Sequence, residues 1–264
     1  MADNHSDYLL EAKDISKSFP GVLALDEVSI QLEPGEVLGL VGENGAGKTT
    51  LMNILTGVMV QDNGEIVLND EPIEFDNPLE SRDEGIAYIH QELNLIEELP
   101  VKENLFLGDL PRASMFSLNY SEMEDRAEEV FESLTIDIDP NDKVKDLPVA
   151  LRQMVEIARA LLFDARIIIM DEPTSSLTDE EIETLFNLIS DLKDEGRSVI
   201  YISHRLEEVF EVTDRVAVLR NGKKVGTKVT QNTDRDEIVK MMAGKEVEQR
   251  YYKEETELGE ELLV

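Results

Sequence analysis

The segment GENGAGKT, Gly42 to Thr49, has the residue types and the spacing that bind a nucleotide phosphate. It fits the pattern G-x-x-x-x-G-K-[ST], whose glycines let backbone N–H groups close around phosphate oxygens. An apolar strand-like run, EVLGLV, precedes it, and a helix-like run, TTLMNILTG, follows it. We expect Lys48 to bridge the β- and γ-phosphates and the Thr49 hydroxyl to ligate Mg²⁺. The expected nucleotide contacts are Gly42, Glu43, Asn44, Gly45, Ala46, Gly47, Lys48, Thr49 and Thr50.

Two acids at the end of another apolar run could supply hydrolytic chemistry. Residues 166–172 read RIIIMDE, in which four apolar residues predict a buried strand. The carboxyl ends of parallel strands border the crevice in which ligands bind. Asp171 would then support Mg²⁺ through water, and Glu172 would polarise an attacking water. Two acids after a strand are equally compatible with a helix cap, but beside a phosphate loop they favour the catalytic interpretation.

Three single residues extend this set. Gln91 follows the strand-like run GIAYIH and could reach Mg²⁺ and the attacking water. His204 follows SVIYIS and could contact the γ-phosphate. Phe19 lies upstream of the phosphate loop and could stack on a purine. Each has a plainer alternative, because lone Gln and His residues are mostly structural and Phe19 could belong to the core.

The alternation of strand-like and helix-like runs predicts an α/β fold. From residue 166 onward the order is RIIIMD, TDEEIETLFNLISDLKDEG, SVIYIS, RLEEVFEVT and RVAVLRNGK. Such alternation indicates a mostly parallel core sheet covered on both faces. Shorter strand and turn signals near the N-terminus predict an antiparallel β piece. Residues 100–163 are helix-like and include an amphipathic helix from Tyr120 to Leu134, with Asn119 near its start.

This pattern divides the chain into two unequal parts. Residues 1–242 are expected to form one ATPase-type domain with a helical subdomain at about 100–163. Residues 243–264 are charged and weakly patterned, and we interpret them as a linker. A frayed chain end is the alternative, since terminal residues are often disordered.

Composition narrows the class of protein. The 264 residues include 25 Lys and Arg against 58 Asp and Glu, which gives a formal net charge of −33. The acids are spread over the whole chain, so they predict an acidic surface that repels nucleic acid and anionic lipid. A salt-rich cytoplasm, in which counterions screen the repulsion, is the plainest explanation. The absence of cysteine excludes disulfides, zinc thiolates and thiol chemistry. No apolar run approaches ~18 residues and MADNHSDY is no signal peptide, so we expect a soluble intracellular chain.

Taken in order along almost the whole chain, these residues resemble an ATP-binding cassette (ABC) ATPase. The resemblance rests on Phe19, GENGAGKTT, Gln91, the helical insert, MDEP, SSLT and His204. The combination of HQELNL, QMVEIARAL and YISHR is more specific than any of these single motifs. It is similar to the first cassette of the tandem ATPases that drive ribose- and galactose-type sugar import.

The resemblance implies a fold, cofactors and partners. It implies a P-loop NTPase fold of the ABC type that uses ATP and Mg²⁺, with His204 as the switch histidine. Members of that family carry two cassettes in one chain and energise a membrane permease from the cytoplasmic face of the cell membrane. They receive sugar from an extracytoplasmic binding protein. This chain carries one cassette, and its ending, GEELLV, resembles its own opening, YLLEAKDIS. The linker would therefore lead into a second cassette.

One segment departs from the family pattern. Where ABC ATPases carry a signature resembling LSGGQ, which covers the γ-phosphate of the partner cassette, residues 147–153 read LPVALRQ. Pro148 replaces the serine hydroxyl and has no N–H. Ala150 adds a Cβ where the backbone must approach the phosphate closely, and Leu151 replaces a polar side chain. We expect a correctly placed helix start whose phosphate recognition is impaired.

Three functions remain compatible with the sequence. The favoured one is the ATP-hydrolysing subunit of a monosaccharide importer, paired with a cassette that has an intact signature. The alternative is a nucleotide-dependent assembly or regulatory module with little hydrolysis, which the altered signature supports and the intact Glu172 and His204 oppose. The third is a soluble cassette that acts on ribosomes or DNA repair. The acidic charge and the absence of a basic stripe disfavour it, and no nucleic-acid partner is expected.

Overall fold

The computed structural model describes residues 8–114 and 117–244 and is built on a six-stranded sheet. Its strand order is β12-β11-β3-β10-β9-β6, and only the β11–β12 pair is antiparallel. The expected mostly parallel core is confirmed, and its central strands are buried on both faces, which explains their uninterrupted apolar runs. The strands are β3 (Val37–Val41), β6 (Ile86–Ile89), β9 (Ile167–Asp171), β10 (Ser198–Ile202), β11 (Arg215–Arg220) and β12 (Lys223–Val229).

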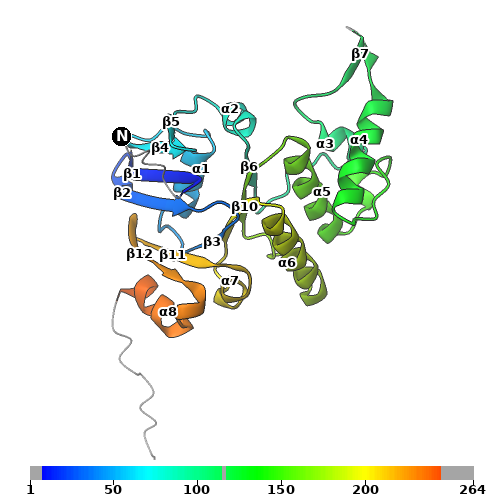
Figure 1. Cartoon of the computed structure of the whole chain (residues 1–264). Coiled ribbons are helices and arrows are strands. Elements are labelled where there is room, and N and C mark those ends of the chain that lie inside the picture. Colours follow the sequence, from blue (N-terminus) through cyan, green and yellow to red (C-terminus); the bar gives the residue numbers. More distant parts are fainter. Residues whose placement is uncertain (1–7, 115–116, 245–264) are drawn as a thin grey trace, which may run out of the picture.

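The predicted antiparallel β piece is a separate sheet of four strands. Its order is β2-β1-β4-β5, and β1 pairs with β2 through a hairpin at Pro20-Gly21. Gly21 has a φ of +82°, a conformation that favours glycine in such a turn. The strands are β1 (Leu10–Phe19), β2 (Val22–Leu32), β4 (Asn63–Leu68) and β5 (Glu71–Ile73). Figure 1 shows this sheet at the side of the molecule opposite the helices α3, α4 and α5.

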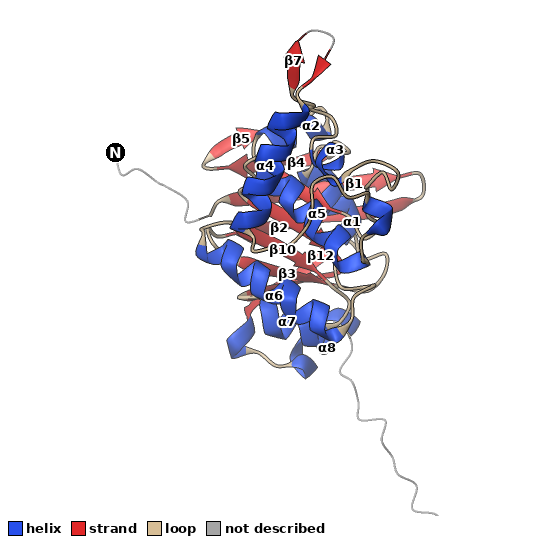
Figure 2. Cartoon of the chain, turned by 90° about the vertical axis from the view of Figure 1, so that its right-hand side faces the viewer, coloured by secondary structure: helices blue, strands red, loops and turns tan. Residues whose placement is uncertain are grey.

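The helix α1 (Lys48–Leu55) lies between the two sheets. Its buried residues Leu51 and Leu55 belong to the same hydrophobic cluster as Leu10 of β1 and Leu38 of β3. A second cluster fills the opposite face of the parallel sheet beneath α6 (Asp179–Asp194) and α7 (Leu206–Val212). Figure 2 shows these helices lying in front of the strands. The helix that follows the phosphate-loop segment is therefore packed between the two sheets.

Local sequence explains where several helices begin. Thr178 and Glu181 form a capping box at the start of α6. Asn77 caps α2 (Pro78–Asp83), and Asp234 caps α8 (Arg235–Ala243). The predicted amphipathic helix is α4 (Tyr120–Ser133), whose N-cap Asn119 accepts a hydrogen bond from the Glu122 N–H.

The helix-rich region is less uniform than its pattern predicts. It contains α3 (Val101–Leu105), α4, a 3₁₀ turn at Val144–Asp146 and α5 (Val149–Leu162). A short hairpin, β7 (Arg112–Ser114) and β8 (Ser117–Leu118), interrupts the helices and was not expected. The helices share one hydrophobic cluster with the sheet, since Phe131 and Met170 belong to the same cluster. The division at residues 100–163 stays a prediction. Of the proposed linker at 243–264, Ala243 ends α8 and Gly244 is its C-cap, and the part from 245 onward lies outside the described residues.

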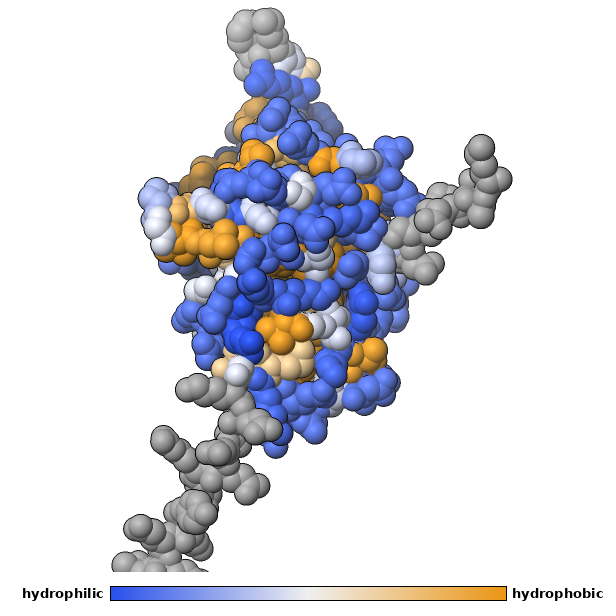
Figure 3. Space-filling model, turned by 90° about the vertical axis from the view of Figure 1, so that its left-hand side faces the viewer, coloured by the Kyte–Doolittle hydropathy of each residue, from blue (hydrophilic) through white to orange (hydrophobic). Residues whose placement is uncertain are grey.

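Figure 3 shows one face as mostly hydrophilic, with small separate hydrophobic patches. Across the described ranges, no helix combines the length and the apolar character that a membrane span requires.

Candidate functional site

The phosphate-loop segment connects β3 to α1 and is packed closely against neighbouring backbone. Gly47 is the N-cap of α1 with a φ of +104°, and a Cβ at this position would lie 2.7 Å from the carbonyl oxygen of Ala24. A Cβ on Gly42 would lie 2.4 Å from the carbonyl oxygen of Leu219. Only glycine fits at both positions, so these glycines let the loop backbone pack directly against β2 and β11 at the start of the helix.

Lys48 lies folded over this loop. Its Nζ donates to the carbonyl oxygens of Gly42, at 2.7 Å, and Glu43, at 3.3 Å. Burial lowers the pKa of the Lys48 ammonium, whereas the carboxylates of Asp171 and Glu172 act in the opposite direction. A cation at a glycine-rich loop beside a helix N-terminus is an arrangement that suits the binding of a negatively charged nucleotide phosphate.

A cleft of about 660 Å³ brings most of the predicted residues together. Phe19 is 42% exposed at its edge, so the alternative that Phe19 is an ordinary core residue is wrong. Gly42, Glu43 and His204 do not line this cleft. The predicted residues that line it are Phe19, Asn44, Gly45, Ala46, Gly47, Lys48, Thr49, Thr50, Gln91, Asp171 and Glu172.

Sequence reasoning missed the turn between β11 and β12, which also lines the cleft. Gly222 donates its N–H to Ala46 O at 3.1 Å and accepts from Asp26 N at 2.8 Å. The turn therefore ties the phosphate loop to β2. An Asn-Gly pair, Asn221-Gly222, was the available signal, because this dipeptide favours tight hairpin turns.

Asp171 ends β9 and is held by a tyrosine from the neighbouring strand. The Tyr88 hydroxyl of β6 donates to Asp171 Oδ2 at 2.8 Å. Burial and the nearby Asp171 carboxylate raise the pKa of Tyr88, so its hydroxyl stays protonated as a donor. No sequence signal marks Tyr88, since a tyrosine in an apolar strand is typical of a core position.

Glu172 and His204 contact one another directly. The Nδ1 atom of His204 lies 2.9 Å from Glu172 Oε1, although the two residues follow different strands. The Glu172 N–H also donates to Ile202 O at 2.8 Å. Glu172 has a φ of +48°, a left-handed conformation that costs about 1–3 kcal/mol for a residue with a side chain. Such strain persists only where the surroundings fix the backbone.

The LPVALRQ segment forms a loop and the first turn of α5, as expected. Pro148 is the N-cap and provides no side-chain hydrogen bond, while Val149 is 43% exposed. The first N–H groups of the helix have no acceptor within it. Arg152 fixes the loop by donating to Leu147 O, Lys145 O and Glu97 Oε1. The helix start is thus well formed but offers an apolar surface and backbone N–H groups in place of a hydroxyl.

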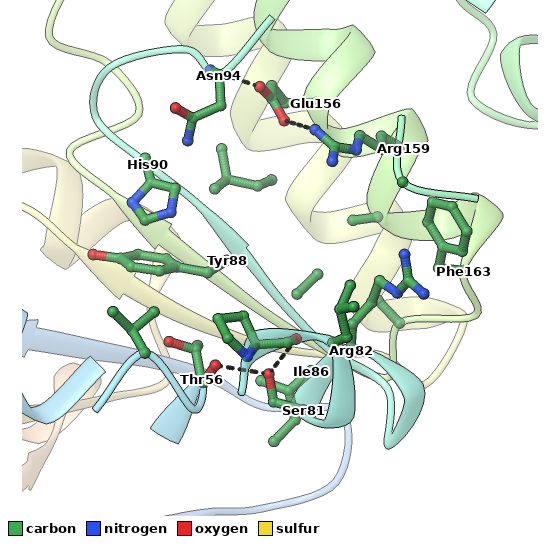
Figure 4. A pocket seen from close by; sticks show the side chains of 18 of the residues that line it. Thr56, Ser81, Arg82, Ile86, Tyr88, His90, Asn94, Glu156, Arg159 and Phe163 are labelled. Atoms are coloured by element: carbon green, nitrogen blue, oxygen red, sulfur yellow. Dashed lines mark hydrogen bonds and ion pairs between the residues drawn. The ribbon is translucent and has the colours of Figure 1, made fainter. Parts of the chain in front are cut away.

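A second cavity, of about 340 Å³, lies among β6, α2 and α5. Figure 4 shows the Tyr88 ring beside His90, with the Tyr88 hydroxyl pointing away from Arg82 and Arg159. The two ring centroids are 4.0 Å apart. Glu156 accepts from the Asn94 N–H at 2.9 Å, and burial raises the pKa of its carboxyl. This cavity therefore shares Tyr88 with the site around Asp171.

The comparisons with known proteins agree with this geometry. The family model described as "ABC transporter" matches residues 25–175. A putative ribose/galactose/methyl galactoside import ATP-binding protein of Burkholderia cenocepacia is 46% identical over 258 residues, which cover 98% of this chain and 49% of the relative. The chain thus spans about half the length of the curated relatives it matches.

Solved structures show the same fold. An ATP-binding cassette of an ABC transporter in its ADP conformation matches with a TM-score of 0.80 and 28% identity, covering 91% of this chain and all of the other. A dimeric bacterial ABC transporter cassette matches with a TM-score of 0.71 and 25% identity, covering 85% of this chain and all of the other. The expected P-loop NTPase fold of the ABC type is confirmed. Together with the family match over more than half its length, this places the chain in the ABC transporter family.

Proposed function

We propose that this chain binds and hydrolyses ATP as a cassette of an importer for a monosaccharide such as ribose or galactose. The observation that carries the proposal is the cleft, which unites an exposed aromatic ring, a glycine-rich loop with its lysine, and two carboxylates. The sugar-import name of the relative supports the substrate class, although it belongs to a protein twice as long.

Each side chain has a chemical role in this proposal. The Phe19 ring stacks on the adenine base, and the N–H groups of the loop hold the phosphates with Lys48. Glu172 accepts a proton from the attacking water as it approaches the γ-phosphate. His204 steadies Glu172 and contacts that phosphate only as the reaction proceeds. Mg²⁺, when bound, would neutralise charge on the phosphate oxygens.

The metal would rest on few protein ligands. In the part of the chain that the structure describes, no group of three or more acidic or histidine side chains could hold a metal ion. Thr49, Gln91 and Asp171, the last through water, would hold Mg²⁺ together with phosphate oxygens. This ligand set suits Mg²⁺, which keeps several waters and commonly uses one or two carboxylates plus substrate phosphates.

The second cavity is the proposed docking site for a membrane permease. Val58 and Leu79 at its border are 50% and 56% exposed, and Arg82 and Arg159 lie in its wall. Apolar side chains with two cations suit a permease segment that carries apolar residues and a carboxylate. Gln91 follows the strand that lines this cavity, so an occupant would lie near the nucleotide cleft. The chain would then work at the cytoplasmic face of the membrane, with an extracytoplasmic sugar-binding protein acting only through the permease.

A second cassette is the other proposed partner. The similar cassette that is dimeric supports a two-cassette assembly. The start of α5 lacks a serine hydroxyl, so the partner should supply an intact signature to this chain's phosphate loop. An assembly or regulatory module with little hydrolysis remains the second candidate, because Pro148 gives α5 no side-chain cap and no hydroxyl.

Co-purification tests the importer assignment. The tagged chain is co-expressed with the permease and cassette genes of its own neighbourhood and isolated from detergent-solubilised membranes. The permease should co-elute, and Leu79→Glu with Arg159→Glu should release it. Arg197→Glu, a cation outside the cavity, serves as the matched control. Recovery of the chain without a permease, or equal recovery with every variant, would contradict the importer proposal.

A further inference from the structure

A buried carboxylate, Glu208 on α7, collects hydrogen bonds from two loops of the site. Glu208 is 5% exposed. The Thr174 hydroxyl lies 2.8 Å from both of its oxygens, and the Ser203 hydroxyl donates to Oε2 at 2.9 Å. Tyr201 OH donates to Oε2 at 2.9 Å, and Arg205 Nη1 donates to Oε1 at 2.6 Å. Hydroxyl and guanidinium donors from both loops therefore converge on one side chain.

These two loops carry the Glu172–His204 contact. Thr174 lies two residues after Glu172, in the loop that follows β9. Ser203 lies directly before His204, in the loop that follows β10. The strands β9 and β10 are parallel neighbours, so the two loops leave the same edge of the sheet. Glu208 is the side chain that fastens both of them to α7.

The arrangement requires a carboxylate in particular. Thr174 and Ser203 are 3% and 2% exposed, so their hydroxyls have little access to water as an alternative partner. Burial raises the pKa of Tyr201, which keeps its hydroxyl a donor toward Glu208. A carboxylate can accept from several donors at once, whereas the nitrogen of a glutamine amide would itself donate. The network is therefore matched to Glu208 and mismatched to its amide.

We propose that Glu208 is a positioning residue that holds Glu172 and His204 in contact. The proposal rests on the hydrolytic role proposed for that pair. Glu172 has a left-handed backbone, which the surrounding structure must enforce. Anchoring Thr174 and Ser203 to one carboxylate fixes the separation of the two loops on either side of the contact. None of the network residues lines the nucleotide cleft, so their loss should leave ATP binding unchanged.

Histidine NMR on the full chain tests this directly. The chain has three histidines, so the ring signals of His204 and His90 can be assigned and followed separately. Glu172→Gln removes the charge 2.9 Å from His204 and should move the His204 signals. In a Glu208→Gln background the same Glu172→Gln change should lose most of that effect, because the pair is already apart. His90 serves as the internal control and should not respond to Glu208→Gln. A full Glu172→Gln effect on His204 in that background would overturn the proposal.

A second pair of variants keeps the test decisive if Glu208→Gln destabilises the chain. Thr174→Val removes the hydroxyl at nearly constant volume, and Thr174→Ser retains it. Thr174→Val should shift the His204 signals, whereas Thr174→Ser should restore the wild-type spectrum. Glu207→Gln, on the neighbouring exposed carboxylate that pairs with Arg235, is the matched control. Identical His204 spectra for Thr174→Val and wild type would reject the role of the network.

Calorimetry on the same samples separates this inference from the proposed function. All of the Thr174 and Glu208 variants that fold should bind Mg-ATP with wild-type affinity. A chain that binds no Mg-ATP would refute the proposed function, while the His204 spectra would still report whether Glu208 holds the pair. Wild-type ATP binding together with displaced His204 signals supports a positioning role, and a loss of ATP binding in Thr174→Val contradicts it.

Discussion

The hydroxyl of Tyr88 donates to Oδ2 of Asp171 at 2.8 Å, between the neighbouring strands β6 and β9. This bond joins two places on the molecule. Asp171 borders the nucleotide cleft, and the Tyr88 ring lines the second cavity, in which we place the permease. A hydrogen bond to a carboxylate fixes the direction of its oxygens, which suits a group that supports Mg²⁺ through water.

Tyr88→Phe should therefore weaken the dependence of ATP binding on Mg²⁺. The variant keeps the ring in the cavity wall and removes only the hydroxyl. Hydrogen bonds to charged groups contribute about 1.5–3 kcal/mol, so the stimulation of ATP affinity by Mg²⁺ should fall roughly 10- to 100-fold. Calorimetric titrations of the chain with ATP, in the presence of Mg²⁺ and in the presence of EDTA, measure this stimulation. Tyr120→Phe, on an exposed tyrosine, is the control, and equal Mg²⁺ stimulation in Tyr88→Phe and wild type would refute the role.

Lys48→Ala should weaken ATP binding strongly. The ammonium is the cation folded over the phosphate loop, and its loss removes a charge-assisted contact worth about 1.5–3 kcal/mol, or roughly a 10- to 100-fold change in Kd. Calorimetry on the purified chain provides the measurement. Lys193→Ala, whose partner Asp214 lies away from the cleft, should bind like wild type. Equal ATP affinity of Lys48→Ala and wild type would contradict the proposal that this loop binds the phosphates.

Glu172→Gln should bind ATP normally and lose turnover. The amide keeps the size of the side chain but cannot accept a proton, so only the transition-state interaction is lost. Proton transfer by a positioned residue typically contributes about 10²–10⁴-fold, and kcat of the assembled complex should fall by that order. Steady-state phosphate release with a parallel binding measurement checks both parts. Turnover at the wild-type rate would show that Glu172 is not the base.

The sequence predicted the fold, and most of the residues that it singled out for phosphate chemistry line one cleft. Strand-to-helix alternation and glycine spacing are local signals. They can be recognised in GENGAGKT and RIIIMDE without knowledge of the fold. The residues that sequence reasoning missed act across strands. Tyr88 and Glu208 have no local signature, because a tyrosine in an apolar strand and an acid on a helix have ordinary explanations. Only their pairing with Asp171, Thr174 and Ser203 gives them a role.

High salt should stabilise the chain. With 58 acids against 25 basic residues, repulsion destabilises the compact state at low ionic strength and is screened by added ions. The midpoint of thermal unfolding should rise between dilute buffer and ~1 M KCl, at which the Debye length is about 3 Å. Sucrose of equal osmolarity is the control, since it is excluded from the surface without screening charge. A Tm that does not rise with KCl would count against an adaptation to salt.

The altered signature should make this chain a slow ATPase on its own. In the proposed two-cassette assembly each site combines one phosphate loop with the opposite signature, so a homodimer would place Pro148 over both sites. Loss of one preorganised donor typically costs ~10²–10³ in rate, so the purified chain should bind ATP yet turn it over slowly.

Pro148→Ser with Ala150→Gly and Leu151→Gln should restore hydrolysis. The start of α5 is already correctly folded, with Arg152 holding the preceding loop, so the three substitutions add a hydroxyl, remove a Cβ and restore a polar side chain without building a new helix. Steady-state phosphate release from the chain alone compares the triple variant with wild type. The same triple variant carrying Glu172→Gln should stay inactive, which would show that the restored hydrolysis occurs at the site that contains Glu172. Vigorous hydrolysis by the unmodified chain would contradict the proposed pairing with a cassette that has an intact signature, because that signature would then be unnecessary.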